Sequence, residues 1–232
     1  MNEIIESGAD VIMNRLPRTP EEIALVIKAK FPPKSLEQVG NEFEAAFKCD
    51  GTVNTAVAEL AVLVREHAAI AVDDFKKAEM WIAAKTPAIS DGNNFGVDVQ
   101  NYVAGELKAM RHAMQGYTDA ASNYHWQRGN GLEKVISKNE SEETSEKTVE
   151  ESKTTSKTVT KSSHKTPPEV VDYIKYTVSL DVKQYFASYT QLVDIRNCYI
   201  KANLMFEKNM KRLEDPRGEG ESGMSRGVMS MY

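Results

Sequence analysis

The sequence predicts an all-α fold, an up-down-up-down bundle of four long helices. Apolar residues recur every three or four positions over long stretches, which is the period of an amphipathic helix. The chain has 27% charged residues and only 8% aromatic residues, a composition typical of an elongated helical protein. The segments between the periodic stretches are short or strongly polar, so consecutive helices are expected to run antiparallel. With 232 residues, 41% of them hydrophobic, we expect a single bundle over residues 1–232.

Composition and charge narrow the possible classes of function. The net charge is −5 and basic residues are mixed with acidic ones, whereas a nucleic-acid-binding protein would carry a basic face or stripe. The two cysteines, Cys49 and Cys198, lie far apart and belong to no metal or redox motif. The longest apolar runs, of which residues 68–72 are one, are far too short for a transmembrane helix. Since no signal peptide is recognisable either, we expect a reduced, soluble, intracellular protein of the cytoplasm or nucleus that binds neither nucleic acid nor membrane.

Residues 3–31 predict a first helical element that proline divides. We expect a kink or break near Pro17, because proline lacks the N–H group that the interior of an α-helix needs. Thr19 then suits the N-cap of a second part, and Pro20 suits the first helical position of that part, where the N–H group is not needed.

The next two helices carry the strongest periodicity. A connector at 32–51, with helical character around 36–47, leads into an apolar stripe over 52–84. This stripe predicts a helix of about eight or nine turns. A second stripe follows a polar turn around residues 91–96, here called the central turn, and predicts a helix that is kinked or frayed at 128–131 and ends near Ile136.

The last third of the chain alternates between polar and apolar segments. Residues 137–166 are almost entirely Ser, Thr, Lys and Glu, so we expect a disordered insertion, in which alternating Lys and Glu support at most a transient helix. An apolar stripe over 168–213 predicts the fourth helix, which Pro216 ends. We expect a flexible tail over 217–232 that is rich in Gly and Ser, although its last residues, Val228 to Tyr232, are mostly apolar.

The antiparallel topology places two of these segments at one end of the bundle. The turn between the second and third helices lies at the same end as the end of the fourth helix. The connector at 32–51 and the insertion at 137–166 lie at the opposite end. The polar turn and the apolar tail are therefore expected to contact one partner together.

No motif for catalysis, cofactor binding or metal binding is recognisable. The stretch at 128–131 contains two glycines but lacks the Walker pattern and follows no predicted strand. None of the histidines has a Cys or carboxylate partner at ligand spacing. The four are His67, His112, His125 and His164. We therefore expect a protein that is not itself an enzyme and needs neither a metal nor another cofactor.

The turn in the middle of the chain is the most distinctive stretch of the sequence. Asn and Gly at 92–94 favour a tight chain reversal, because both tolerate positive φ. The run Asp91-Gly92-Asn93-Asn94-Phe95-Gly96-Val97, preceded by Met80-Trp81-Ile82 and Pro87, resembles the activation-loop segment of the 11S proteasome activators, the REG family. The fourth helix resembles that of the family in order and spacing at Leu180-Asp181, Tyr185, Ile195-Arg196-Asn197, Tyr199, Lys208-Asn209, Lys211, Leu213 and Pro216-Arg217-Gly218. A C-terminal tyrosine after an apolar residue, Met231-Tyr232, is the third match.

The resemblance implies a heptameric ring of four-helix subunits that docks on the α-ring of the 20S proteasome and opens its gate without ATP. Tails of family members insert between α-subunits, and their activation loops hold the gate open. Carried over to this sequence, Asn93 is the residue most critical to opening. The resemblance assigns the loop to Asp91, Gly92, Asn93, Asn94, Phe95 and Gly96, and the inserting tail to Ser230, Met231 and Tyr232. The sequence departs from the animal members in placing its charged insertion between the third and fourth helices, whereas theirs joins the first and second.

A second interpretation of the same sequence is a scaffold that activates nothing. In this alternative, a helical bundle binds partner proteins through its polar arm at 137–166. Stimulation of peptide hydrolysis by purified 20S proteasome distinguishes the two functions.

Overall fold

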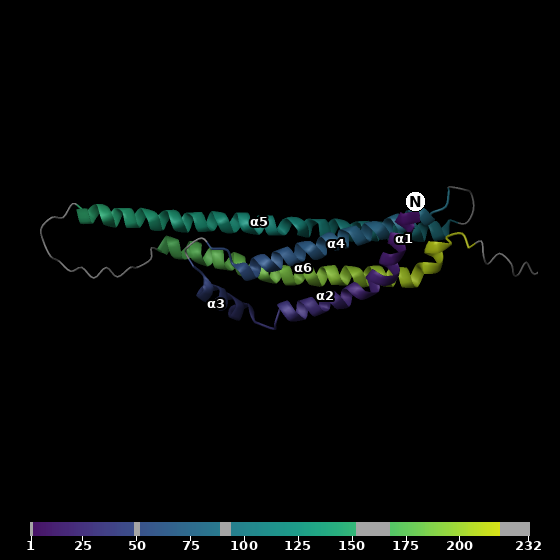
Figure 1. Cartoon of the computed structure of the whole chain (residues 1–232), viewed down its shortest axis with the longest axis horizontal. Coiled ribbons are helices and arrows are strands. Elements are labelled where there is room, and N and C mark those ends of the chain that lie inside the picture. The colour runs from purple at the N-terminus through teal and green to yellow at the C-terminus, as the bar shows by residue number, and fades with distance from the viewer. Residues whose placement is uncertain (1, 49–51, 89–93, 152–167, 219–232) are drawn as a thin grey trace, which may run out of the picture. The chain divides into compact units, whose positions relative to one another are not determined.

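The structure, a computed structural model, describes residues 2–48, 52–88, 94–151 and 168–218. Its elements are α1 (Asn2–Asp10), the π-helical segment η1 (Val11–Arg15), α2 (Leu16–Lys30), α3 (Leu36–Ala46), α4 (Thr55–Lys85), α5 (Phe95–Glu151) and α6 (Pro168–Glu214) (Figure 1). All regular structure among the described residues is helical, which confirms the predicted all-α fold. The stretch from α1 through α2 is one of the four long helical elements, and α4, α5 and α6 are the other three.

The first helical element differs from the prediction at its prolines. The chain is helical from the start of α1 to the end of α2, so it is not broken at Pro17. Thr19 and Pro20 lie inside α2, and their prediction as N-cap and first helical residue is wrong. The irregular part is η1, where the backbone N–H of Leu16 donates to the carbonyl of Val11, five residues earlier. A wider turn fits this position, because the ring of Pro17 would clash with the carbonyl group four residues before it in a regular α-helix.

The remaining helices follow the prediction with one exception. The described ends of α4 and α6 lie close to the predicted ones, and α3 occupies the predicted helical part of the connector. The exception is α5, which continues past Ile136 to Glu151 and is not interrupted at 128–131. The backbone of residues 137–151 is therefore helical and not irregular as predicted, in a segment where Lys–Glu pairs favour a helix. The rest of the predicted insertion, 152–167, lies outside the described residues, as does the tail from 219 onward.

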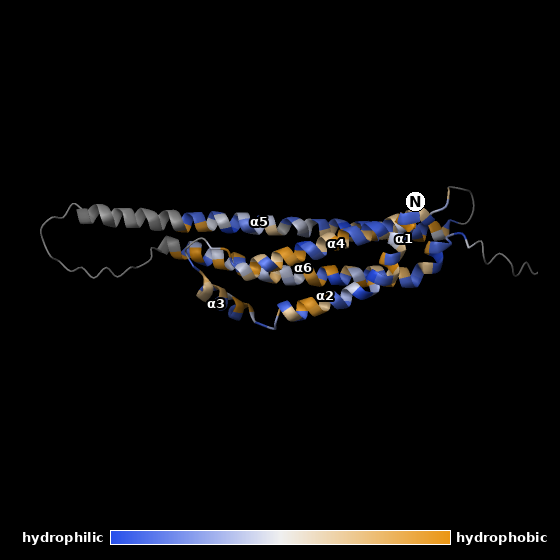
Figure 2. Cartoon of the chain, viewed as in Figure 1, coloured by the Kyte–Doolittle hydropathy of each residue, from blue (hydrophilic) through white to orange (hydrophobic). Residues whose placement is uncertain are grey.

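The chain divides into two compact units, to both of which α4, α5 and α6 contribute. The first unit comprises residues 1–28, 66–116 and 192–232, and the second comprises 29–65 and 117–191. Figure 2 shows apolar and hydrophilic residues interleaved along α4 and α6, the pattern of helices with one buried face. The core of the first unit contains the largest fully buried apolar side chains, which are Leu16, Ile23, Phe75, Ile82, Leu107, Met114, Leu192, Ile195, Tyr199, Phe206 and Leu213.

One charged residue lies inside the core of the first unit. Asp74, on α4, is fully buried; its Oδ2 accepts a 2.6 Å hydrogen bond from the Tyr199 hydroxyl and lies 2.9 Å from the Arg15 guanidinium. Burial raises the pKa of the Asp74 carboxyl, and burial together with this carboxylate raises the pKa of Tyr199. The contacts connect α4 with α6 and with η1. They therefore fix the helices of this unit relative to one another.

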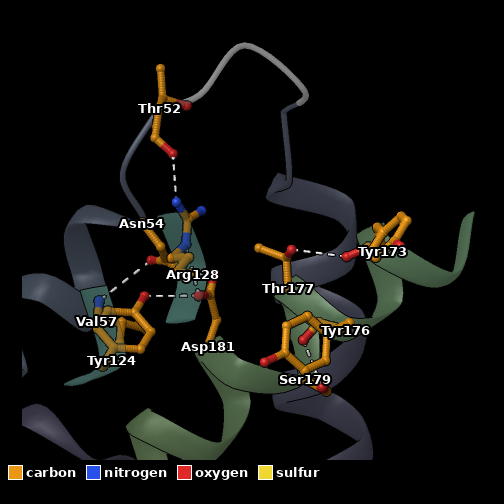
Figure 3. A network of polar contacts seen from close by, with 10 residues as sticks. All are labelled: Thr52, Asn54, Val57, Tyr124, Arg128, Tyr173, Tyr176, Thr177, Ser179 and Asp181. Carbon is orange, nitrogen blue, oxygen red and sulfur yellow. Dashed lines mark hydrogen bonds and ion pairs between the residues drawn. The ribbon is translucent and has the colours of Figure 1, made fainter. Parts of the chain in front are cut away.

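A second buried polar network, shown in Figure 3, holds the start of α4 in the second unit. The carboxylate of Asp181, on α6, accepts hydrogen bonds from the Tyr124 hydroxyl at 2.8 Å and from Arg128 Nε at 2.9 Å, both from α5. Its other oxygen accepts a bond from Asn54 at 2.9 Å, and Arg128 also donates to the carbonyl of Thr52 at 3.0 Å. Burial, and then the charge of Asp181, raise the pKa of Tyr124. Arg128, which the sequence analysis placed at a kink, is thus a buried partner of Asp181.

Replacing Asp181 with alanine is expected to lower the free energy of unfolding by about 3 kcal/mol, because the Arg128 charge is then buried without its partner. Urea denaturation followed by circular dichroism measures this change. The matched control is Asp73→Ala, since the Asp73 side chain is 57% exposed in its ion pair with Lys77, compared with 3% for Asp181. This control should cost less than about 1 kcal/mol. Equal losses in the two variants would contradict the role given to the buried network.

Candidate functional site

The predicted activation loop lies in the connection between α4 and α5. At the end of α4, the hydroxyl of Thr86 donates to the carbonyl of Ile82 at 3.0 Å, and the helix ends there. Three of the predicted loop residues, Asp91, Gly92 and Asn93, lie outside the described residues. The described ends of the loop are residues 86–88 on one side and 94–96 on the other.

The last three predicted loop residues form the start of α5. The carbonyl of Asn94 accepts a 3.0 Å hydrogen bond from the backbone N–H of Asp98, which places Asn94 at the N-cap position. Asn94 is exposed, and the Phe95 side chain is 56% exposed. Gly96, in contrast, is buried. The loop therefore presents a polar residue and an aromatic residue to solvent above a buried glycine.

A buried glutamine connects this start of α5 with the ends of two other helices. Gln100 is fully buried, and its side-chain amide donates to the carbonyl of Leu213 in α6 at 2.8 Å. The same nitrogen lies 3.4 Å from the carbonyl of Lys85, the last residue of α4. Carbonyl groups in the last turn of a helix have no partner within the helix. The Gln100 amide of α5 thus donates to two such carbonyl groups, one on α4 and one on α6.

The chain after α6 packs closely against the first turn of α5. A Cβ atom placed on Gly96 would lie only 1.9 Å from the carbonyl oxygen of Pro216. Only glycine permits this approach of the two backbones. The chain then turns at Gly218, whose φ of 67° also favours glycine and whose N–H donates to the Asp215 carboxylate at 3.0 Å.

Two arginines add contacts at the edge of the same site. The guanidinium of Arg212 lies over the Phe95 ring at 4.7 Å from its centroid, a cation–π geometry. Arg217 donates to the carbonyl of Ala88, on the α4 side of the loop, at 2.6 Å. Both sides of the loop therefore contact the end of α6. We call these contacts the loop–tail clamp; its residues are Ala88, Phe95, Gly96, Gln100, Arg212, Leu213, Pro216 and Arg217.

The clamp confirms that the described ends of the central turn meet the end of the fourth helix, as the topology predicts. Ser230, Met231 and Tyr232, the predicted tail residues, lie outside the described residues, but the segment that leads to them starts beside the loop. The sequence analysis missed Gln100 and Arg212 as parts of this site. Arg217 belonged to a stretch that resembles the family, but no sequence signal indicated that it contacts Ala88.

Burial shifts the pKa of two potentially reactive side chains among the described residues, Cys198 and His67. No group of three or more His, Cys, Asp or Glu residues among the described residues is placed to hold a metal ion. Burial raises the pKa of the Cys198 thiol, which makes it less reactive. Burial also lowers the pKa of the half-buried His67. In the described ranges, no helix is long and apolar enough to cross a membrane.

Comparison with known proteins gives a consistent match to one family. The family model described as proteasome activator PA28, C-terminal, matches residues 51–156 and 132–223. Proteasome activator complex subunit 3 from Homo sapiens is 24% identical over 164 residues, which cover 71% of this chain and 53% of the human protein. The subunit 3 proteins of Mus musculus and Gallus gallus match over the same length with the same identity. The chain thus spans about half the length of these relatives.

A solved structure has the same fold. The crystal structure of the 11S subunit of the Plasmodium falciparum proteasome, PA28, matches with a TM-score of 0.68 and 19% sequence identity. The match covers 93% of this chain and 90% of the Plasmodium chain. The likeness therefore extends over nearly the whole length of both chains.

Proposed function

The chain belongs to the PA28 proteasome activator family, and from this premise we propose that it is an ATP-independent activator of the 20S proteasome. The tail residues Ser230, Met231 and Tyr232 dock on the α-ring, and the loop from Asp91 to Gly96 opens the substrate gate. The observation that carries this proposal is the bond from Gln100 to Leu213, which puts the root of the loop beside the root of the tail. Such a protein acts inside the cell, in the cytoplasm, the nucleus or both.

Docking by the tail has a simple physical basis. A C-terminal carboxylate with an apolar residue before it suits a groove that captures chain ends. Binding of one tail is weak, because ordering each of its residues costs about 1–2 kcal/mol of conformational entropy. Several tails on one assembly bind far more tightly, since the first contact raises the effective concentration of the others.

This mechanism calls for a homo-oligomer, which we propose is a heptameric ring. Exposed apolar side chains on two helices of the first unit support an assembly. They are Ile70 and Met80 on α4, each 43% exposed, and Ile200 and Leu204 on α6, 40% and 42% exposed. Of these, Ile200 and Leu204 line one hollow in the surface of α6, and apolar side chains that gather in this way suit contact with another protein. Measurement of the mass in solution determines the number of subunits.

The proposal predicts that the purified chain stimulates hydrolysis of short fluorogenic peptides by purified 20S proteasome of the same species. ATP should have no effect on the stimulation, since the sequence has no nucleotide-binding loop. The control is the proteasome with its peptidase sites inhibited, which shows that the proteasome and not the added chain cleaves the peptide. No stimulation at a saturating concentration of the assembled chain would overturn the proposal and favour a scaffold.

A further inference from the structure

We propose that the loop–tail clamp is a positioning element, in which Gln100 fixes the described ends of the gate-opening loop relative to the end of α6, from which the chain continues to the docking tail. This inference rests on the proposed function, because it assigns a role to Gln100 and Arg217, which belong neither to the gate-opening loop nor to the docking residues. It follows from three features of the clamp: the buried amide, the close approach of two backbones, and the contacts on both sides of the loop.

The buried amide of Gln100 is not what core stability alone would select. Its Oε1 is buried and has no hydrogen-bond partner among the described residues, and an unpaired buried acceptor destabilises a core. Leucine of similar size would remove that cost, but it would leave the carbonyls of Leu213 and Lys85 without this donor. What glutamine adds is a pair of contacts, to Leu213 and Lys85, that fix the distance between the ends of α6 and α4. Residues that violate the usual core pattern in this way are often found at functional sites.

The other contacts prevent the loop and the root of the tail from separating or sliding. Gly96 and Pro216 are so close that no Cβ atom fits between them. Arg217 bonds to the carbonyl of Ala88, so the α4 side of the loop contacts the same segment as the α5 side. The loop is therefore held at both of its described ends.

The proposed function requires a rigid connection between the ends of the loop and the end of α6. Tail binding decides where each subunit sits on its partner, whereas opening depends on where the loop then lies. A site that acts by contact loses efficiency steeply when its parts are displaced by about 1 Å. In this proposal, the clamp keeps the ends of the loop in one position relative to the end of α6 while the tail docks.

The test separates docking from opening in a titration of the activator against a fixed amount of 20S proteasome. Gln100→Leu removes both contacts and keeps the side-chain volume nearly constant. We expect its maximal stimulation to fall severalfold, because loss of two ordinary hydrogen bonds lets the loop leave its clamped position. The concentration that gives half-maximal stimulation should stay near the wild-type value, because the tail is unchanged. Wild-type maximal stimulation would overturn the proposal, and so would a shift in the half-maximal concentration alone.

If Gln100→Leu does not assemble, a second pair of variants, at Arg217, tests the same proposal. Arg217→Ala removes the contact with Ala88 from the surface of the subunit and should lower maximal stimulation in the same way. Arg217→Lys keeps a cationic donor and should restore most of the stimulation, which a purely structural loss would not explain. Unchanged maximal stimulation in Arg217→Ala would overturn the clamp.

A matched control uses Gln184, the other buried glutamine among the described residues, which lies on α6. Gln184 donates to Ser188 of the same helix at 3.3 Å and belongs to the second unit. Gln184→Leu should leave maximal stimulation unchanged, and an equal loss there would overturn the proposal. If the wild-type chain and the clamp variants stimulate the proteasome equally, the clamp proposal is wrong and the proposed function is still supported. If the wild-type chain does not stimulate the proteasome, both the proposed function and the clamp proposal are wrong.

Discussion

Deletion of Met231 and Tyr232 is expected to abolish binding to the 20S proteasome, and with it all stimulation. The deletion removes the apolar residue and the aromatic residue beside the terminal carboxylate, and leaves Ser230 at the chain end. If each tail loses about 1 kcal/mol and several tails of one assembly bind together, the apparent affinity falls by several orders of magnitude. Co-sedimentation with the proteasome measures binding, and peptide hydrolysis measures stimulation.

The control for this deletion shortens the tail by the same amount and keeps its end. Removing Glu221 and Ser222 leaves the last residues, Val228 to Tyr232, intact. This variant should bind with an affinity near that of the wild type. Unchanged binding of the chain without Met231 and Tyr232 would refute the assignment of the docking tail.

The sequence predicts the long helices well because their signal is local. Apolar residues at three- and four-residue spacing define α4 and α6 nearly to their ends, and side chains such as Phe75 and Ile195 are fully buried as that spacing predicts. Topology alone predicts that the central turn meets the end of α6. The contacts of Gln100 and Arg217 confirm it.

The features that the sequence does not predict depend on partners far along the chain. Asp74 resembles any hydrated acidic residue of α4, and it is buried because Tyr199, 125 residues later, meets its carboxylate. Gln100 likewise lies 113 residues from Leu213. No periodicity encodes such pairs. The π-helical turn before Pro17 is also missed, because proline signals an interrupted helix without saying whether the chain breaks or widens its turn to continue.

Replacement of Asn93 by phenylalanine is expected to leave docking intact and to abolish opening, the reverse of the tail deletion. Asn93 stands between Gly92 and Asn94 in a run that favours a tight reversal, where a bulky residue resists positive φ and cannot form the hydrogen bonds of an amide. Both described ends of the loop are held by the clamp, so the change should stay local. Peptide hydrolysis should fall to the level of the proteasome alone, while co-sedimentation stays at the wild-type level.

Competition between Asn93→Phe and the wild-type chain for the α-ring tests this prediction more strictly than a loss of activity does. A chain that docks without opening occupies the α-ring, so Asn93→Phe should inhibit stimulation by added wild-type chain in proportion to its concentration. Asn101→Phe, the same substitution at an exposed residue of α5, should stimulate like the wild type. Loss of binding by Asn93→Phe would show that the loop contributes to docking, and the division of roles between loop and tail would be wrong. Inhibition without stimulation would instead show that docking and opening are separate events, with the loop needed only for the second.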